Sequence, residues 1–391
     1  MKIVTIHNRY VSIQPSGEND AVTNEVAELV RRGVQNQLVE MKSDDFLTLN
    51  PISKFLVFLR SVTFGFLSLS KSNKGEIFSA DLVHVHNTFP FFGYKLFRTL
   101  HRKRIPIVLT VHNARLTCLN GSHLYRSKKC NLCPVAGNFR PGVLRKCYRN
   151  SHFLSLFYAR YTNRLRNSIS SVDKFVVLND VSRTSLEKLG IEPKRIVQKF
   201  TPVIGPKVEV STKSKNLLFA GRVSTDKGID LLLKAWVDSG LNESGWILHV
   251  AGSGEFLENT ESSSWASQGV RFHGFLKNQD LELLLAESEF VVVPSLGYEG
   301  FPTMISKAAS MGKRVLASDI PSFQHLKNLT WVTLIEPTEA TWSTSLSNLR
   351  NEINERYSQD AQLWWQENAS FTSNSQFMLD LYEETLKDKD D

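Results

Sequence analysis

Short apolar runs separated by amphipathic segments repeat along the chain. In the first half the runs are residues 2–6, 82–87, 105–113 and 172–179; in the second half they are residues 216–220, 246–251, 270–274, 290–293, 314–317 and 331–335. Several are rich in β-branched residues, as buried parallel strands are. Strands that alternate with helical segments require crossover connections, so the pattern predicts doubly wound α/β sheets.

The segments between these runs carry apolar residues at helical spacing. The predicted helices are residues 24–32, 151–166, 182–189, 229–237, 302–312 and 361–386. Gly33, Gly190 and Gly312 lie at or just beyond the ends of three of them, where a helix C-terminus favours glycine.

Residues 52–69 are rich in Phe and Leu and also contain Lys54 and Arg60. This composition leaves three alternatives open. The segment is a helix that packs on the core, an amphipathic segment at a membrane interface, or a spanning helix, which Arg60 and the short length disfavour.

A chain of 391 residues exceeds a single ordinary core, which favours two domains. Residues 201–206 break the regular pattern and place a linker near residues 204–212. We predict an N-terminal domain at residues 1–207, with a cysteine-rich insertion at about residues 114–150. A C-terminal domain at residues 208–372 and a terminal helix at residues 373–391 follow.

Composition agrees with a soluble globular protein, since 41% of the residues are hydrophobic and 22% are charged. The first residues do not resemble a signal peptide, and no apolar run reaches the ~20 residues of a membrane span. A cytoplasmic location is the resulting expectation.

The net charge of +8 conceals a strong asymmetry. Residues 1–210 contain 32 Lys and Arg against 14 Asp and Glu, and residues 82–172 contain no acidic residue at all. A basic half of this kind suits a polyanionic partner, such as an anionic membrane surface, a pyrophosphate-linked substrate or nucleic acid.

All four cysteines lie within 30 residues, at Cys118, Cys130, Cys133 and Cys147. In a cytosolic chain a C-x2-C pair with two flanking cysteines favours a four-cysteine structural zinc site over disulfides. The alternative is four thiols without a metal. Basic and aromatic residues surround them, a combination that also fits a nucleic-acid module.

Residues 290–312 read as a strand, a glycine-containing loop and a helix that begins near Pro302. Free backbone amides and the helix dipole make such a junction an anion site. Residues 216–237 repeat the arrangement, with Arg222 and Lys227 in the loop. Arginine binds phosphate oxygens as a fork and lysine as a point charge; two solvated loop cations are the alternative.

Both loops resemble those of the family 4 glycosyltransferases, which are retaining enzymes of the GT-B fold. The E-G-F-P motif of that family matches Glu299, Gly300, Phe301 and Pro302. Its G-R-…-K-G signature matches Gly221, Arg222, Lys227 and Gly228. The cysteines are similar to those of a bacterial polysaccharide-type subgroup.

The resemblance implies two Rossmann-like domains facing across a cleft. The N-terminal domain would be on the acceptor side, the C-terminal domain would bind the nucleotide sugar, and the terminal helix would cross back toward the N-terminal domain. It also implies that Arg222 and Lys227 stabilise the leaving diphosphate, so that no catalytic metal is required. Glu299 would accept hydrogen bonds from hydroxyls of the donor sugar.

Three further donor-site residues follow from the resemblance. His112, directly after the apolar run at residues 105–111, corresponds to a histidine near the donor sugar; a satisfied strand-end histidine is the alternative. Gly17 lies in the first glycine loop, where the family usually has two glycines. Lys307 replaces a second glutamate that accepts from the nucleotide ribose. An ammonium has no acceptor, so Lys307 would donate to the ribose, reach the diphosphate or pair with Glu299.

The predicted function is that of a retaining hexosyltransferase-type glycosyltransferase. It would move a sugar from a nucleotide donor to a glycan or polyprenyl-pyrophosphate-linked acceptor, in cell-surface polysaccharide biosynthesis at the inner membrane face. A UDP-sugar 2-epimerase on the same fold would need additional carboxylates and histidines around the cleft. A non-catalytic sugar-nucleotide or nucleic-acid binder is the other alternative, although we do not expect a nucleic-acid partner.

Overall fold

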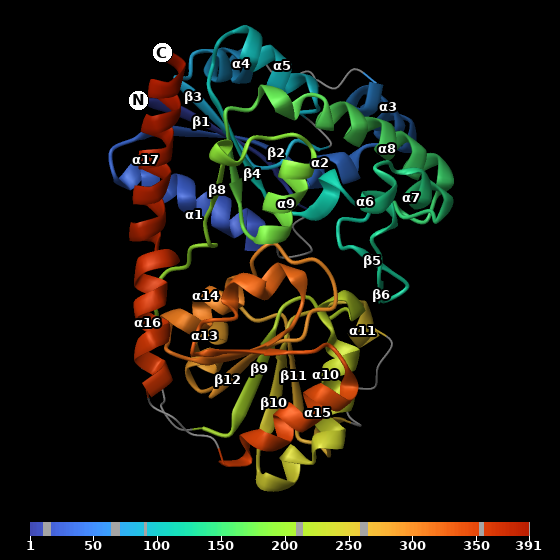
Figure 1. Cartoon of the computed structure of the whole chain (residues 1–391), viewed down its shortest axis with the longest axis vertical. Helices are drawn as coiled ribbons and strands as arrows, with labels where there is room; N and C mark the ends of the chain where they lie inside the picture. Colours follow the sequence, from blue (N-terminus) through green and yellow to red (C-terminus); the bar gives the residue numbers. More distant parts are fainter. Residues whose placement is uncertain are drawn as a thin grey trace. The chain divides into compact units, whose positions relative to one another are not determined.

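The computed structural model describes residues 1–10, 17–63, 71–89, 92–208, 214–258, 265–351 and 356–390. The chain divides into two compact units (Figure 1). Unit 1 comprises Met1–Gly121, Asn131–Phe200 and Phe371–Asp391. Unit 2 comprises Ser122–Cys130 and Thr201–Ser370.

Unit 1 contains a six-stranded parallel sheet in the order β2-β1-β3-β4-β7-β8. Its strands are β1 (Lys2–Arg9), β2 (Gln35–Lys42), β3 (Leu82–Val85), β4 (Ile107–Val111), β7 (Lys174–Val177) and β8 (Ile196–Gln198). Its longer helices are α1 (Gly17–Arg31), α3 (Pro51–Thr63), α4 (Lys71–Phe78), α5 (Lys95–Arg102), α8 (His152–Arg166), α9 (Asp180–Lys188) and α17 (Phe371–Asp390). Short helices are α2 (Ser43–Thr48), α6 (Leu132–Ala136) and α7 (Arg140–Leu144).

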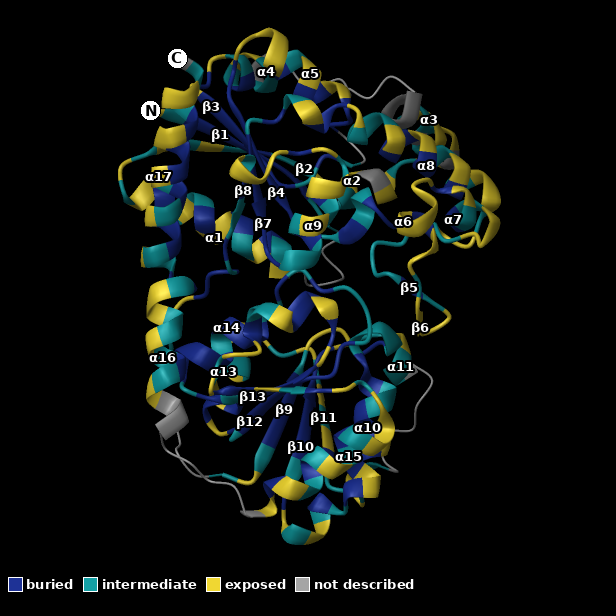
Figure 2. Cartoon of the chain, viewed as in Figure 1, coloured by how far each residue is buried: buried dark blue, intermediate teal, exposed yellow. Residues whose placement is uncertain are grey.

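Alternating residues of the central strands enter two different hydrophobic clusters, because successive strand side chains point to opposite faces. Val83 and Val85 join a cluster that includes apolar residues of α5, whereas Leu82 joins a cluster that includes apolar residues of α17. Both faces of the sheet are therefore covered, as a parallel sheet requires. The buried strands appear dark blue in Figure 2.

The C-terminal helix α17 is an integral part of unit 1. Its residues Met378, Leu381 and Tyr382 are buried against Ile3 of β1 and Leu29 of α1. Since these contacts place α17 beside β1, the core of unit 1 combines segments that are far apart in the sequence.

Unit 2 contains a second six-stranded parallel sheet, in the order β11-β10-β9-β12-β13-β14. Its strands are β9 (Asn216–Ala220), β10 (Ile247–Ala251), β11 (Val270–Gly274), β12 (Phe290–Val293), β13 (Arg314–Ser318) and β14 (Val332–Ile335). Its helices are α10 (Ile229–Ser239), α11 (Glu255–Glu258), α13 (Asn278–Ala286), α14 (Thr303–Ser310), α15 (Glu339–Asn348) and α16 (Arg356–Asn368). A short hairpin, β5 (Leu124–Tyr125) and β6 (Lys128–Lys129), also belongs to this unit.

The predicted fold class, a two-domain doubly wound α/β protein, is confirmed by the two parallel sheets. The helical sequence predicted at residues 361–386 is divided between two helices, α16 and α17. Val203 accounts for the break, because its amide donates to Ala369 O at 3.0 Å and it forms a β-bridge with Ser370.

The segment predicted at residues 52–69 forms helix α3 over its described part; residues 64–69 lie outside the described residues. Val57 packs on the core of unit 1, but Ile52, Phe55 and Leu56 are exposed. Helix α3 therefore buries only part of its apolar face. In the described part of the chain, none of the helices combines the length and apolar character needed to span a bilayer.

Candidate donor-binding site

The sheet of unit 2 changes direction between β9 and β12. From β9 the next strand, β10, is added on one side, whereas β12 on the other side is followed by β13 and β14. Ligands of doubly wound sheets bind at the carboxyl ends of the strands at such a switch point. The two loops that leave these ends are residues 221–228 and 294–302, which are the two loops that carry the sequence motifs.

The two loops pack directly against each other. The amide of Leu296 donates to Asp226 O at 3.0 Å. Gly228 has a φ of +75°, and a β-carbon there would overlap with the carbonyl oxygen of Pro294. Only glycine fits this position, for reasons of both backbone conformation and space. The close approach of the loops therefore depends on Gly228.

An ion pair joins the loops at their charged residues. Lys227 Nζ donates to both carboxylate oxygens of Glu299, at 2.6 and 2.8 Å. Ser295 Oγ also donates to Glu299 Oε1, at 2.5 Å, and the Glu299 amide donates to Ser322 Oγ at 3.3 Å. Glu299 is only 9% exposed. The carboxylate is thus held in one orientation with a cation beside it.

Arg222 lies in the same loop as Lys227 and has an acidic partner of its own. Its guanidinium donates to Asp226 Oδ2 at 2.6 Å, and Ser224 Oγ donates to Asp226 Oδ1 at 2.6 Å. The Arg222 side chain is 53% exposed. A fork of donors that is accessible to solvent can exchange a carboxylate for phosphate oxygens. Asp226 was not expected from the sequence, where it is one polar residue among several.

The second loop leads into α14. Pro302 takes the N-cap position of this helix, and Phe301 is buried in unit 2, where its ring stacks on Trp364 at a centroid distance of 6.2 Å. Thr201 Oγ1 donates to Phe301 O at 3.1 Å. Lys307 lies half-buried in the second turn of α14. The packing of Phe301 fixes the point at which the helix N-terminus leaves the loop that contains Gly300.

Gly221 begins the first loop directly after β9. Its amide donates to Ala251 O at 3.0 Å, and a β-carbon on Gly252 would overlap with the Gly221 carbonyl oxygen. The backbone segments that follow β9 and β10 therefore approach each other closely, directly before Arg222.

In unit 1, His112 follows β4 directly, at the carboxyl end of that strand, and is half-buried. A nitrogen-to-nitrogen hydrogen bond of 2.9 Å joins His112 Nε2 to His86 Nδ1. Burial and the neighbouring histidines hold the pKa of both imidazoles well below the usual value. His112 is thus neutral at pH 7. Gly17 is the exposed first residue of α1, and Ser16 lies outside the described residues.

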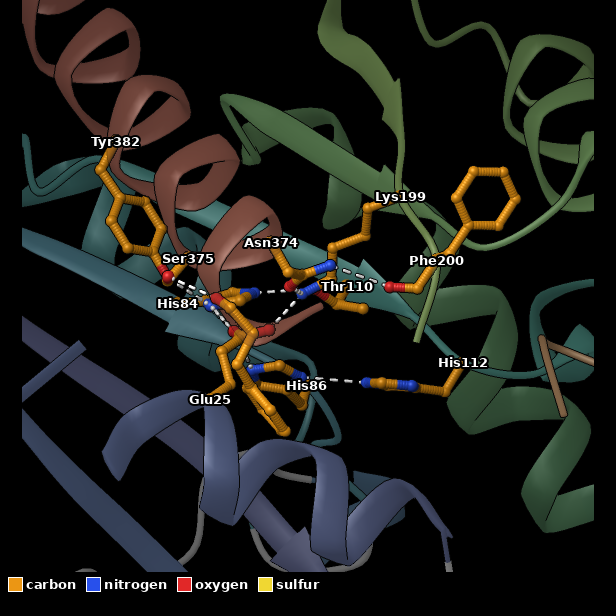
Figure 3. A network of polar contacts seen from close by, with 11 residues as sticks. Glu25, His84, His86, Thr110, His112, Lys199, Phe200, Asn374, Ser375 and Tyr382 are labelled. Atoms are coloured by element: carbon orange, nitrogen blue, oxygen red, sulfur yellow. Dashed lines mark hydrogen bonds and ion pairs between the residues drawn. The ribbon is translucent and has the colours of Figure 1, made fainter. Parts of the chain in front are cut away.

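Behind His112 lies a buried polar network that the sequence did not predict (Figure 3). Glu25 of α1 forms an ion pair with Lys199, and its Oε1 lies 3.4 Å from His84 Nδ1 and 3.7 Å from His86 Nε2. Tyr382 Oη is 2.7 Å from His84 Nδ1. The only sequence signal was the alternation of His84 and His86 in an otherwise apolar strand, which places both in the protein interior.

Glu25, His84 and His86 also form the one group of three potential metal ligands that the described residues contain. The Lys199 ammonium that contacts Glu25 Oε2 argues against a divalent ion there, since the two cations would repel each other. We therefore interpret the group as a hydrogen-bonding network.

The cysteines are not arranged as the zinc prediction requires. Within the described residues, no three of them bring their sulfur atoms within 4.8 Å of one another. Cys133 is buried in a cluster with Leu119 and aromatic residues of α8, and Cys118 Sγ donates to Asn120 Oδ1 at 2.8 Å. Because the described cysteines form no such group, the structure gives the zinc prediction no support.

Two families match the chain over complementary parts. Residues 16–198 match the family described as Glycosyltransferase Family 4, and residues 214–348 match the family described as Glycosyl transferases group 1. The first match covers most of unit 1 and the second covers the sheet of unit 2, including both loops of the candidate site.

Individual relatives agree with these families. An uncharacterised glycosyltransferase of Methanocaldococcus jannaschii is 28% identical over 173 residues, which is 39% of this chain and 44% of that protein. The chain spans less than two thirds of the length of the curated relatives that it matches.

Solved structures show the same fold. Anabaena HepE, in complex with UDP and glucose, has a TM-score of 0.62 at 14% identity and covers 98% of this chain and 100% of its own. WaaG, a glycosyltransferase involved in lipopolysaccharide biosynthesis, has a TM-score of 0.64 at 14% identity and covers 97% and 99%. With both domains matched by family and by fold, the chain belongs to the family 4-type glycosyltransferases of the GT-B fold.

Proposed function

We propose that this protein transfers a sugar from a nucleotide-sugar donor to a glycan or lipid-linked acceptor, with retention of anomeric configuration. The observation that carries the proposal is the Lys227–Glu299 pair, which joins two loops at the switch point of unit 2. The first of these loops also carries Arg222. One carboxylate can bind sugar hydroxyls and two cations can bind a diphosphate, so the loops offer partners for both halves of a nucleotide sugar.

In the proposed reaction the bond from the anomeric carbon to the diphosphate oxygen breaks, and a bond from that carbon to the acceptor oxygen forms on the same face. The leaving phosphate oxygen takes the acceptor proton. Negative charge grows on the diphosphate during this step, and Arg222 and Lys227 stabilise it. Amides at the N-terminus of α14 add to this effect. Glu299 accepts hydrogen bonds from the donor sugar, and we retain His112 as a further donor-sugar contact.

UDP-sugars are the first donors to test, because HepE binds UDP and glucose. Incubation with UDP-, GDP- and ADP-sugars should release nucleoside diphosphate from one of them, and the same donor should raise the thermal stability of the protein. Thermal stabilisation without nucleotide release would support a non-catalytic sugar-nucleotide binder. Salt-sensitive RNA binding without either effect would support a nucleic-acid binder.

Lys307 is proposed to weaken recognition of the nucleotide ribose. Replacing Lys307 with Glu should tighten nucleotide binding by about tenfold in calorimetry, because a carboxylate can accept hydrogen bonds from both ribose hydroxyls and such charge-assisted bonds are strong. Lys307→Gln, which has one acceptor and no charge, is the control and should have a smaller effect. Unchanged or weaker binding by the glutamate variant would contradict the interpretation.

We also propose that unit 1 binds an anionic membrane surface, where a lipid-linked acceptor of polysaccharide biosynthesis would be located. Helices α3 and α7 each contact α8. These three helices and α6 carry exposed apolar side chains. These side chains are Ile52, Phe55, Leu56, Val135, Leu144, Phe153 and Leu156. The segment that contains α6, α7 and α8, residues 82–172, has no acidic residue. Exposed apolar groups beside basic residues are typical of interfacial binding.

The double substitution Phe55→Ser and Leu56→Ser should reduce binding to vesicles that contain anionic lipid by about tenfold or more in a flotation assay, because it removes two side chains that would enter the interface. Leu363→Ser, at an exposed leucine of α16 in unit 2, is the matched control and should bind as the wild type does. Equal loss of binding in the control, or no loss in the double variant, would exclude this surface.

A further inference from the structure

We propose that Glu25, acting through His86, fixes the tautomer of His112, so that His112 carries its proton on Nε2 and presents Nδ1 as a hydrogen-bond acceptor. Glu25 and His86 are in this sense positioning residues. The consequence for the donor sugar rests on the proposed function, whereas the tautomer itself is a property of unit 1 alone.

A hydrogen bond joins the imidazoles of His86 and His112. β3 and β4 are neighbouring parallel strands with Val85 opposite Leu109, so the residues that follow them emerge at one edge. His86 Nδ1 and His112 Nε2 are 2.9 Å apart. Both rings are neutral at pH 7, because their pKa values are held well below the ordinary value. A bond between two neutral imidazoles needs one N–H and one lone pair, and the geometry alone permits either direction.

The other nitrogen of His86 decides the direction. His86 Nε2 is buried, has no hydrogen-bond partner among the described residues and lies 3.7 Å from Glu25 Oε1. A carboxylate oxygen only accepts. A proton on Nε2 is attracted to this oxygen, whereas a lone pair would be repelled by it, and in a buried environment the difference is large. The proton of His86 is therefore on Nε2.

The protonation of His112 follows from this assignment. With its proton on Nε2, His86 has a lone pair on Nδ1 and can only accept from His112 Nε2. His112 must then hold its single proton on Nε2, and its Nδ1 has a lone pair. The described residues provide Nδ1 with no hydrogen-bond partner, so it is available to a ligand as an acceptor.

Glu25 can serve this purpose because its charge is balanced. Lys199 forms an ion pair with its second oxygen, and Lys199 Nζ also lies 3.3 Å from Asn374 Oδ1. Asn374 Nδ2 donates to Phe200 O at 2.9 Å, which anchors the amide. A buried carboxylate is stable only with such a partner. Lys199, which follows β8, thus holds Glu25 of α1 beside His86, and Asn374 of α17 holds Lys199 (Figure 3).

An acceptor nitrogen on His112 determines which sugar group can bind to it. A sugar hydroxyl that contacts Nδ1 must donate its proton to it. Replacing that hydroxyl by fluorine removes the O–H group and should weaken binding of the nucleotide sugar. A His112 with its proton on Nδ1 would still donate its N–H to the fluorine.

The test is the tautomer itself. Long-range ¹H–¹⁵N correlation spectra of histidine-labelled protein at pH 7.5 distinguish protonated from unprotonated ring nitrogens, and His112→Gln identifies the signals of His112. We expect His86 and His112 both to be protonated on Nε2 only. A proton on Nδ1 of His112, or a doubly protonated ring, would overturn the proposal.

The role of Glu25 is tested with the double variant Glu25→Gln, Lys199→Met, which removes both charges together so that no unpaired charge stays buried. The fraction of His112 protonated on Nδ1 should rise at least tenfold, while the exposed His101 keeps its spectrum. An unchanged tautomer in the folded variant would show that Glu25 does not set it. Should this variant fail to fold, the wild-type spectrum still decides the assignment. A wild-type spectrum as predicted without nucleotide release would refute the proposed function alone.

Discussion

Replacing Lys227 with methionine is expected to slow sugar transfer by about a hundred- to a thousandfold, which is the usual cost of removing one donor that stabilises developing charge. The methionine keeps the length and apolar stem of the side chain but loses the ammonium. Two effects then combine: the diphosphate loses a cation, and Glu299 loses its partner in the second loop. Nucleotide release from the accepted donor measures the change.

The matched control is Lys234→Met. Lys234 is an exposed lysine of α10 in the same unit, and its Nζ lies 3.9 Å from a Glu339 oxygen, so the same substitution removes an ion pair away from the loops. Exposed pairs of this kind contribute little, and the activity should stay within about twofold. If Lys227→Met retains wild-type activity while its thermal unfolding is unchanged, Lys227 does not stabilise the leaving group.

Replacing Gly228 with alanine is expected to destabilise unit 2 and to weaken nucleotide binding more than tenfold. A positive φ costs a residue with a β-carbon about 1–2 kcal/mol, and overlap with the Pro294 carbonyl adds an overpacking cost of about 1–3 kcal/mol. The two loops must separate to relieve the overlap, which moves Lys227 away from Glu299. Calorimetric unfolding and nucleotide titration measure the two effects.

The control variant Gly245→Ala separates the cost of a positive φ from the cost of steric overlap. Gly245 also lies in unit 2 and has a φ of +79°, but the nearest atom to an added β-carbon is Lys215 Cδ at 4.0 Å. This variant should lose only about 1–2 kcal/mol and should bind nucleotide normally. Equal behaviour of the two variants would mean that the contact between the loops is unimportant.

The sheets could be predicted because their central strands are continuous apolar runs. β2 and β8 could not, for different reasons. β2 has the sequence Gln35-Asn36-Gln37-Leu38-Val39-Glu40-Met41-Lys42 and lies at a sheet edge, where one side needs no apolar partner. β8 has only three residues, too few for a period to appear.

The two loops of the candidate site in unit 2 could be located from the sequence because they carry the family motifs between a strand and a helix. The partners of the residues in these motifs could not. Asp226 and Ser295 contact Arg222 and Glu299 through short local geometry that no spacing rule specifies. The buried polar network behind His112 could not be predicted from the sequence, since Glu25 lies within an amphipathic helix and Lys199 just beyond a short strand. Only the tertiary fold brings these side chains together.

The location of α17 also affects the order in which the protein can fold during synthesis. Domains usually fold as units, the N-terminal one first as the chain is made. Here α17 supplies Met378, Leu381 and Tyr382 to the core of unit 1, so that core is incomplete until α17 has been synthesised. Unit 2 has all its residues once Ser370 has been made. The sheet of unit 2 is therefore the first that can be completed as the chain is made, whereas the core of unit 1 is completed only after the 20 residues of α17 have been added.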